Sequence, residues 1–295
     1  MSDDDRRPDL LYHYTTTQGL IGILDSDCLW ATEVRFLNDV SEASYGREVV
    51  LEALRAAIKA EQDKGRLRNL RTALSYFTPR LGWDMSSIVV CFSEQPDQLS
   101  QWRAYGRGGG FAIGFDRSAL EQERTFADAP AFYLVPVMYE RSAQLRAAAG
   151  SIRQYLDHPK MAKLESGEGV AVALFLQVAV FKNVAFEEER EWRAVTHVGV
   201  NPCPLKFRPS PWGPTPYGTF PLRTAHDATS PVREVRVGPS LTRTRSEPES
   251  TCFSSHTGWT YRSSPRKCRC GSGRSTANKH SLRPPVLPPA SHAAT

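Results

Sequence analysis

The predicted fold is built around FKNVAFEEEREWRAVT (Phe181–Thr196), in which a run of carboxylates gives way to an alternating apolar segment. Trp192 and Val195 favour an extended chain, which places Glu191 on the first residue of a strand and Glu189 on the loop that enters it. Sheet enzymes often carry a catalytic carboxylate at such a place. A solvated acidic turn is the alternative interpretation, because runs of charge commonly face water.

Hydrophobic periodicity predicts strands and helices as far as residue 237. Strands are expected at residues 10–15, 28–32, 88–92, 111–115, 132–139, 191–195 and 232–237. Helices are expected at residues 17–24, 41–60, 67–76, 143–156 and 170–180, with a short one that carries residues 101–103. Residues 202–221, rich in Pro and aromatic side chains, are expected to form a loop. The pattern predicts an α+β fold.

The charge of the chain is unevenly distributed, and this sets the expected domain boundaries. Residues 242–295 hold nine Lys or Arg and two Glu, or +7, which leaves 28 basic and 30 acidic residues, or −2, for residues 1–241. A slightly acidic body is a poor candidate for a nucleic-acid groove. We expect a disordered N-terminus at residues 1–9, one domain at residues 10–241, and a disordered, basic Ser/Arg/Pro-rich tail at residues 242–295. The abrupt loss of order signals also suggests a frameshifted C-terminus.

Composition argues against membrane, secretory and metal-dependent classes. No apolar run approaches the length of a membrane span, and the acidic N-terminus does not resemble a secretory signal, so a cytoplasmic protein is expected. Cys28 and Cys91 lie in apolar runs, and the Cys268–Cys270 pair lacks the spacing and second pair of a zinc site. We therefore predict neither a metal site nor a disulfide framework.

Familiar catalytic and nucleotide motifs are also missing. The glycine cluster at residues 106–110 precedes a strand rather than a helix, which argues against a dinucleotide-binding turn. The sequence has no P-loop and no nucleophile elbow. Polar residues in strand-end positions remain as candidates, each with a structural alternative: His13 as a core histidine, Trp102 as core packing, and Arg103 as the partner of a structural carboxylate.

An ordered series of sequence blocks resembles a known family. The blocks are LYHYTT…GLIGIL, LWAT…RFLNDVSE…YG, CFSE…LSQWRAYG, GFAIGFD, FKNVAFEEEREWR, FRPSPWGPTPY and VREVRVGP. They are similar to the signature blocks of the bacterial domain of unknown function 2971 family, over roughly residues 10–241. Such proteins usually continue with a further helix and strand, whereas the tail of this chain departs from that pattern.

The layout of that family is in turn similar to ADP-ribosyltransferases. The resemblance implies split, mainly antiparallel sheets flanked by helices, and a catalytic trio drawn from three strands. His13 matches the first member and Glu191, in the pair Glu189-Arg190-Glu191, matches the last. Thr32 or Tyr45 is the middle member, a choice that the sequence leaves open. The LYHYT start also resembles the first strand of DNA-targeting ADP-ribosyltransferase toxins.

The resemblance further implies that NAD is the substrate and that ADP-ribose passes to an unidentified acceptor, a protein or a nucleic acid. Glu191 would bind the ribose 2′-hydroxyl and stabilise the oxocarbenium-like state formed as the nicotinamide bond breaks. Glu189 would orient the acceptor, and His13 would hold the other ribose. The remaining expected NAD contacts are Tyr14, Thr15, Thr32, Arg35, Tyr45, Trp102 and Arg103.

The resemblance gives some of these contacts a specific role. Tyr14 or Tyr45 would stack on nicotinamide, and Arg103 or Arg35 would meet the pyrophosphate.

Other classes of function remain open. One alternative is a non-catalytic nucleotide- or protein-binding module, in phage defence or a toxin system, with Glu191 in a structural pair with an arginine. The other is an NAD-using RNA 2′-phosphotransferase. The oligomeric state is left open.

Overall fold

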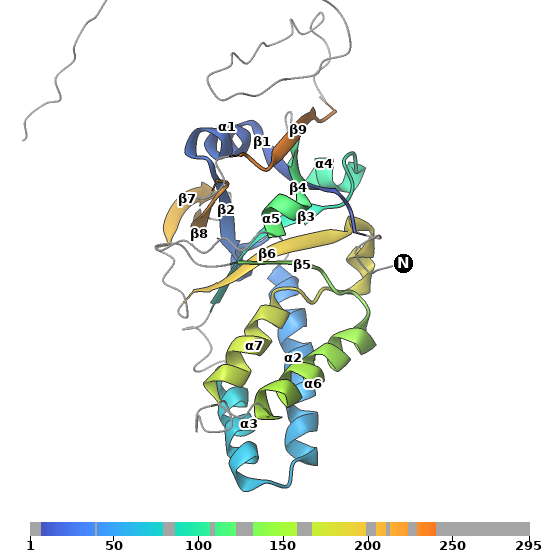
Figure 1. Cartoon of the computed structure of the whole chain (residues 1–295), viewed down its shortest axis with the longest axis vertical. Coiled ribbons are helices and arrows are strands. Elements are labelled where there is room, and N and C mark those ends of the chain that lie inside the picture. The colour runs from blue at the N-terminus through green and yellow to red at the C-terminus, as the bar shows by residue number, and fades with distance from the viewer. Residues whose placement is uncertain are drawn as a thin grey trace, which may run out of the picture. The chain divides into compact units, whose positions relative to one another are not determined.

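The structure is a computed structural model (Figure 1). It describes residues 7–38, 40–78, 86–106, 110–121, 132–157, 167–198, 205–210, 213–223 and 229–239. The strands are β1 (Leu10–Thr16), β2 (Cys28–Glu33), β3 (Ser86–Ser93), β4 (Gly110–Asp116), β5 (Tyr133–Pro136), β6 (Glu191–Val198), β7 (Lys206–Ser210), β8 (Gly213–Pro221) and β9 (Val232–Val237). The helices are α1 (Thr17–Ser26), η2 (Val34–Phe36), α2 (Val40–Ala60), α3 (Lys64–Tyr76), α4 (Leu99–Tyr105), α5 (Arg117–Glu121), α6 (Arg141–Asp157), α7 (Glu168–Val178) and η3 (Val184–Glu189).

The described strands form one sheet in which every strand pair is antiparallel. Its main path runs β7-β8-β2-β3-β1-β4-β9, while β6 pairs with β3 and β5 pairs with β6. The predicted α+β class and the mainly antiparallel pairing are confirmed.

The sheet divides at β3. One edge of β3 pairs with β6 from Ser86 to Ser93. The other edge pairs with β2 at Ile88 and Val89 and with β1 at Ser93. Between these points, residues 90–92 have no strand partner on that edge among the described strands. The divergence of β1 from β2 therefore leaves a gap over the middle of β3.

Four helices pack against one another and form their own apolar core. In Figure 1, α2, α3, α6 and α7 lie together on one side of the sheet. Leu54, Leu70, Ile152 and Leu174 are among the buried side chains that they share. The α7 sequence is apolar all round, as a helix surrounded by other elements requires. The chain then passes from α7 to η3 and β6, the stretch that carries the candidate carboxylates.

Local sequence signals account for the first strand and helix. β1 and β4 pair along their whole length, from Leu10 opposite Asp116 to Thr16 opposite Gly110. Thr16 caps α1, because its hydroxyl oxygen accepts a hydrogen bond from the Gly19 amide at 3.2 Å. The predicted first strand is confirmed, and the helix that follows it begins at this cap.

The loop predicted at residues 202–221 is wrong, because the structure has the hairpin of β7 and β8 there. Proline is tolerated because β7 is an edge strand and β8 pairs with β2 only from Tyr217 onward. Pro214 and Pro216 precede that point. The loop was predicted because each proline was taken as a loop signal, although proline is also found in edge strands.

Glu191 opens β6 as predicted, whereas Glu189 is not on a loop but is the last residue of η3. Arg190 separates them in the left-handed region, with φ of 42°, and ends the helix. A non-glycine residue rarely adopts this conformation. The reversal at Arg190 lets two carboxylates of adjacent elements approach the same neighbours.

Several predictions concern segments that the structure covers only in part. The predicted tail and frameshift at residues 242–295 lie outside the described residues, as do residues 1–6 of the predicted disordered N-terminus. Arg117 donates to the carbonyl oxygens of Pro8 and Asp9, which anchors the described end of the chain. Within the described ranges, the helices are too short or too polar to cross a membrane.

Candidate functional site

A cavity of about 630 Å³ lies over the gap between β1 and β2. Residues 89–92 of β3 line it, together with side chains of β1, β2, α4, η3, β6, β7 and β8. Sites for small molecules commonly have about 300–1,000 Å³. The division of the sheet thus creates a space of the right size for a small-molecule ligand.

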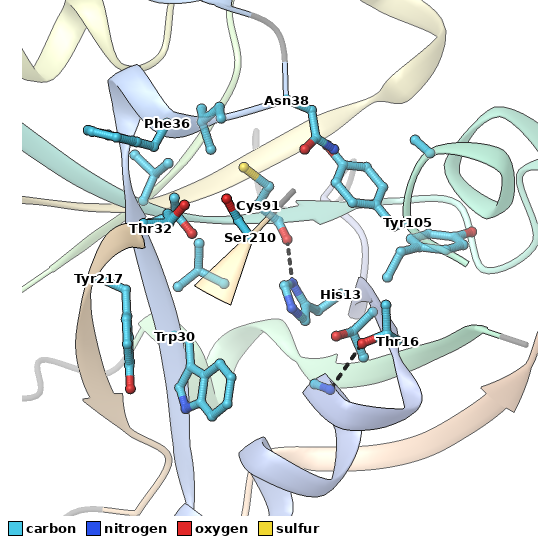
Figure 2. Close-up of a pocket in the computed structure, with 18 of the residues that line it drawn as sticks. His13, Thr16, Trp30, Thr32, Phe36, Asn38, Cys91, Tyr105, Ser210 and Tyr217 are labelled. Atoms are coloured by element: carbon cyan, nitrogen blue, oxygen red, sulfur yellow. Dashed lines mark hydrogen bonds between the residues drawn. The ribbon is translucent and has the colours of Figure 1, made fainter. Parts of the chain in front are cut away.

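His13 projects into the middle of this cavity (Figure 2). Its Nδ1 lies 2.8 Å from the carbonyl oxygen of Cys91, on the unpaired part of the β3 edge. Since a carbonyl oxygen only accepts, Nδ1 carries the proton and donates it. Burial lowers the pKa of His13, and the nearby Arg208 lowers it further, against the effect of the Cys91 carbonyl. The imidazole is therefore neutral at pH 7, and its Nε2 is left as an acceptor.

A charge cluster of five residues reaches the cavity, which two of its members, Glu189 and Glu191, line. It comprises Glu42 of α2, Lys182, Glu189, Glu191 and Arg193. The Lys182 ammonium lies 2.7 Å from Glu189, 2.8 Å from Glu42 and 3.0 Å from Glu191. Arg193 binds both oxygens of Glu191, at 2.6 and 2.9 Å, and also contacts Glu42. Three carboxylates share two cations, so the cluster carries one excess negative charge when all are ionised.

The two candidate carboxylates have opposite pKa shifts. Burial alone would raise the pKa of Glu191, but Arg193 and Lys182 outweigh burial and lower it to about 2. Burial raises the pKa of Glu189, and Lys182 offsets this only in part because Glu191 and Glu42 add repulsion. Glu191 is therefore ionised at neutral pH, and Glu189 is the more basic carboxylate. Pairs of carboxyl groups whose surroundings separate their pKa values are typical of acid–base sites.

Backbone contacts fix the turn that carries these carboxylates. The Ser93 hydroxyl donates to the carbonyl oxygen of Glu189 at 2.8 Å, and the Glu94 amide donates to that of Arg190 at 3.1 Å. The Glu191 amide donates to the phenol oxygen of Tyr139 at 2.9 Å. The end of β3 thus holds η3 and β6 in place against the cavity.

A cation lines the wall built by β2, β7 and β8. Arg208 donates from Nη2 to the Thr32 hydroxyl at 2.7 Å. Its guanidinium carbon lies 5.8 Å from the ring centre of Trp30 and 5.7 Å from that of Tyr217, within cation–π range. Burial lowers the pKa of Arg208, although an arginine stays charged at any physiological pH.

Aromatic side chains supply much of the remaining surface. In Figure 2, Trp30 and Tyr217 lie on one side of His13 and Tyr105 lies on the other. Phe36 and Phe207, which also line the cavity, are 46% and 68% exposed. Such planar side chains are suited to stacking on a flat ring of a ligand.

The structure brings together six of the residues predicted from the sequence. The residues that line the cavity are His13, Tyr14, Thr15, Thr32, Glu189 and Glu191. Of the two candidates for the middle member of the trio, Thr32 accepts a hydrogen bond from Arg208, whereas Tyr45 lies in the helical core and donates to Gln144 at 2.9 Å. Tyr14 binds the backbone of residues 95 and 98 through its hydroxyl.

The other predicted NAD contacts lie outside the cavity lining. Trp102 is buried beside Tyr14 and donates to Asp97 at 2.7 Å. Arg35 pairs with Glu33 at 2.8 Å, and Arg103 is exposed on α4. These positions favour the structural alternative for Trp102.

Sequence reasoning missed Lys182, Cys91, Tyr105 and Arg208. Lys182 and Arg208 lie within blocks of the family resemblance, FKNVAFEEEREWR and FRPSPWGPTPY, and each is a cation beside aromatic residues. That signal could have indicated them. Cys91 and Tyr105 carry no comparable signal, since their place in the cavity follows from strand pairing alone.

Fold and site together define a class: an α+β domain with a divided antiparallel sheet, a cavity at the division and a charge cluster in the cavity wall. Residues 101–194 match the model of a family described as a protein of unknown function, DUF2971. The match supports the resemblance drawn from the sequence blocks, and it includes Lys182, Glu189, Glu191 and Arg193. No curated protein and no solved structure matches the chain. In the described ranges, no group of three or more His, Cys, Asp or Glu side chains is arranged to hold a metal ion.

Proposed function

We propose that this protein cleaves the bond between nicotinamide and ribose in NAD and transfers ADP-ribose to an acceptor, on a fold of ADP-ribosyltransferase type. One observation carries the proposal: His13 of β1 and Glu191 of β6, distant in the sequence, line one cavity at the division of the sheet. This is the arrangement that the family resemblance implies. The cavity volume and its aromatic walls also suit a nucleotide.

The electrostatics of the charge cluster suit the chemistry. As the bond between nicotinamide and ribose breaks, positive charge develops on the ribose ring. Glu191 is ionised and lines the cavity with Glu189, and the cluster to which both belong has an excess negative charge that stabilises the positive charge on the ribose. The acceptor oxygen or nitrogen then bonds to the ribose carbon, and neutral nicotinamide leaves. Glu189, with its raised pKa, takes the proton of the acceptor.

His13 and Glu189 divide the remaining tasks. The Nε2 of neutral His13 accepts a hydrogen bond from a ribose hydroxyl, and the Cys91 carbonyl fixes the ring for this. Glu189 is the more exposed carboxylate of the pair, at 20% against 6% for Glu191, so it is the one that an entering acceptor meets.

A second candidate function is nucleotide binding without turnover. The observation that favours it is that Arg193 and Lys182 contact both oxygens of Glu191, as in a structural ion pair. In this case the cavity binds NAD, and Glu191 only holds α2 and β6 together.

The test measures nicotinamide release from NAD by the full-length protein and by Glu189→Gln and Glu191→Gln variants. Charge stabilisation is worth about 10²–10³-fold in rate, which is the loss expected in Glu191→Gln. Proton transfer to a positioned base is worth about 10²–10⁴-fold, which is the loss expected in Glu189→Gln. Glu188→Gln is the matched control, since Glu188 is an exposed carboxylate on the same short helix.

Thermal melting must show that each variant is folded, and NAD affinity must be measured in parallel. If the wild type binds NAD but releases no nicotinamide, the proposed reaction is overturned and the second candidate function, nucleotide binding without turnover, is supported. Equal release by the wild type, Glu189→Gln and Glu191→Gln would remove both carboxylates from the mechanism.

A further inference from the structure

Within the described ranges, Arg208 has no acidic partner of the kind that buried arginines usually have. It is partly buried in the cavity wall, and no described carboxylate forms an ion pair with it. Among the described residues it contacts the Thr32 hydroxyl and the rings of Trp30 and Tyr217, all of them uncharged. A partly desolvated cation thus faces the cavity, and no carboxylate of the described residues neutralises it.

Removing such a cation from water costs free energy unless an anion binds beside it. Moving a charge out of water is unfavourable, and an opposite charge recovers part of the cost. The two cations and three carboxylates of the charge cluster pair with one another, whereas Arg208 stands apart from them. The unmet charge is therefore available to a ligand.

The surroundings of Arg208 keep its guanidinium in one orientation. Thr32 binds Nη2, and Trp30 and Tyr217 restrict the plane of the group. Nε and Nη1 make no hydrogen bond to the part of the chain that the structure describes, so both are donors for a ligand. Since a guanidinium presents its donors as a flat fork that matches two oxygens of a phosphate, preorganisation strengthens the contact.

We infer that Arg208 forms an anion subsite for the phosphate or pyrophosphate of a nucleotide. The inference deepens the proposed function and rests on it for the nucleotide, while the anion requirement rests on Arg208 itself. The Thr215 hydroxyl also lines the cavity and is a further donor for phosphate oxygens. The cavity is bipolar: the phosphate binds at Arg208, and the ribose that reacts lies toward Glu189 and Glu191. This orientation is the one that NAD cleavage requires.

The experiment compares three probes by isothermal titration with the full-length protein: ADP, adenosine and inorganic pyrophosphate. None contains a nicotinamide–ribose bond, so binding is measured apart from cleavage. A charge-assisted arginine–phosphate contact changes the dissociation constant about 10- to 100-fold. We expect ADP to bind tighter than adenosine by that factor, and Arg208→Gln to abolish the difference. Arg208→Lys, which keeps the charge but not the fork, should recover it only in part.

Lys206→Gln is the matched control, because it removes the same charge from an exposed site on the same strand. It should bind ADP as the wild type does. Pyrophosphate that binds in an Arg208-dependent way supports the subsite and shows that phosphate alone is recognised; pyrophosphate that fails while ADP binds supports a subsite that also needs the nucleoside.

If the wild type binds ADP and adenosine with equal affinity, the inference is overturned. This result does not depend on any variant being folded. Unchanged ADP affinity in Arg208→Gln also overturns it. The same holds if the wild type binds neither ADP nor pyrophosphate. If NAD is not cleaved but ADP binding depends on Arg208, the proposed reaction fails and the subsite stands. If NAD is cleaved with an unchanged KM in Arg208→Gln, the subsite fails and the reaction stands.

Discussion

The Nδ1 of His13 donates to the carbonyl oxygen of Cys91 across 2.8 Å, at the part of β3 that neither β1 nor β2 pairs. The bond bridges the division of the sheet where backbone pairing is missing. It satisfies a polar group of the β3 edge and fixes the imidazole in one tautomer. The same contact therefore serves the fold and prepares Nε2 as an acceptor in the cavity.

The burial of His13 predicts a specific pH dependence of stability. Burial holds the pKa of His13 below its ordinary value of 6.5. Below that pH the unfolded chain gains a proton that the folded chain does not bind until a lower pH, so His13 reduces stability as the pH falls. We expect the free energy of unfolding in urea to drop less between about pH 7.5 and about pH 5.5 in His13→Gln than in the wild type. An equal drop in both proteins would show that His13 titrates normally.

Glu191 predicts an acid transition of its own. Its pKa is about 2 in the folded protein against an ordinary 4.5. Its stabilising effect is complete above about pH 4.5 and is lost as the pH falls toward 2. Glu191→Gln should therefore show a flatter loss of stability between about pH 5 and about pH 3. Glu188→Gln should keep the slope of the wild type, and a wild-type slope in Glu191→Gln would contradict the paired state.

At pH 7 the two carboxylates should respond oppositely to neutralisation. The lowered pKa of Glu191 means that its charge stabilises the fold, and breaking a buried pair costs about 3–5 kcal/mol. The raised pKa of Glu189 means that its charge is disfavoured in the folded state, so Glu189→Gln should raise stability. Urea unfolding of both variants measures the two signs.

The result for Glu189 also bears on its role. A residue that weakens the fold by its charge is often kept for function. Higher stability of Glu189→Gln together with lost NAD cleavage would indicate a catalytic group. Lower stability would show instead that the Lys182 contact dominates and that Glu189 is structural.

The sequence was sufficient for most of the fold because its helices and strands follow strong local periodicity. The apolar run at residues 88–92 and the alternation at residues 232–237 both became strands. The hairpin at residues 206–221 was missed because its prolines obey the geometry of an edge strand, which only the sheet order reveals. The division at β3 was similarly invisible, since pairing partners depend on contacts between distant segments.

The sequence predicted the candidate site only for residues whose place on a strand follows from the hydrophobic pattern. His13 and Glu191 lie at strand positions that periodicity fixes, and both line the cavity. The pyrophosphate contact was expected at Arg35 or Arg103, but Arg35 is bound by Glu33 and Arg103 is exposed. Whether an arginine is neutralised depends on its neighbours in space, and it is this property that distinguishes Arg208.

The packing of α2 against α7 gives a last prediction. A β-carbon added at Gly46 would lie 2.4 Å from the carbonyl oxygen of Val178, so an alanine there must displace backbone. Overpacking costs about 1–3 kcal/mol, against the roughly 1 kcal/mol by which alanine improves a helix. Gly46→Ala should therefore destabilise the protein. A β-carbon at Gly150 of α6 would have no atom within 4 Å, so Gly150→Ala should stabilise it by about 0.5–1 kcal/mol.

The pair also tests whether the helices position the site. Gly46 lies one helical turn after Glu42, and Lys182 follows Val178 closely in the chain, so spreading α2 from α7 separates members of the charge cluster. ADP and NAD affinity, measured by titration, should change in Gly46→Ala and stay at the wild-type value in Gly150→Ala. If Gly46→Ala lowers the melting temperature but leaves NAD affinity and nicotinamide release unchanged, the contact of Glu42 with Lys182 is structural only, because the site then tolerates its loss.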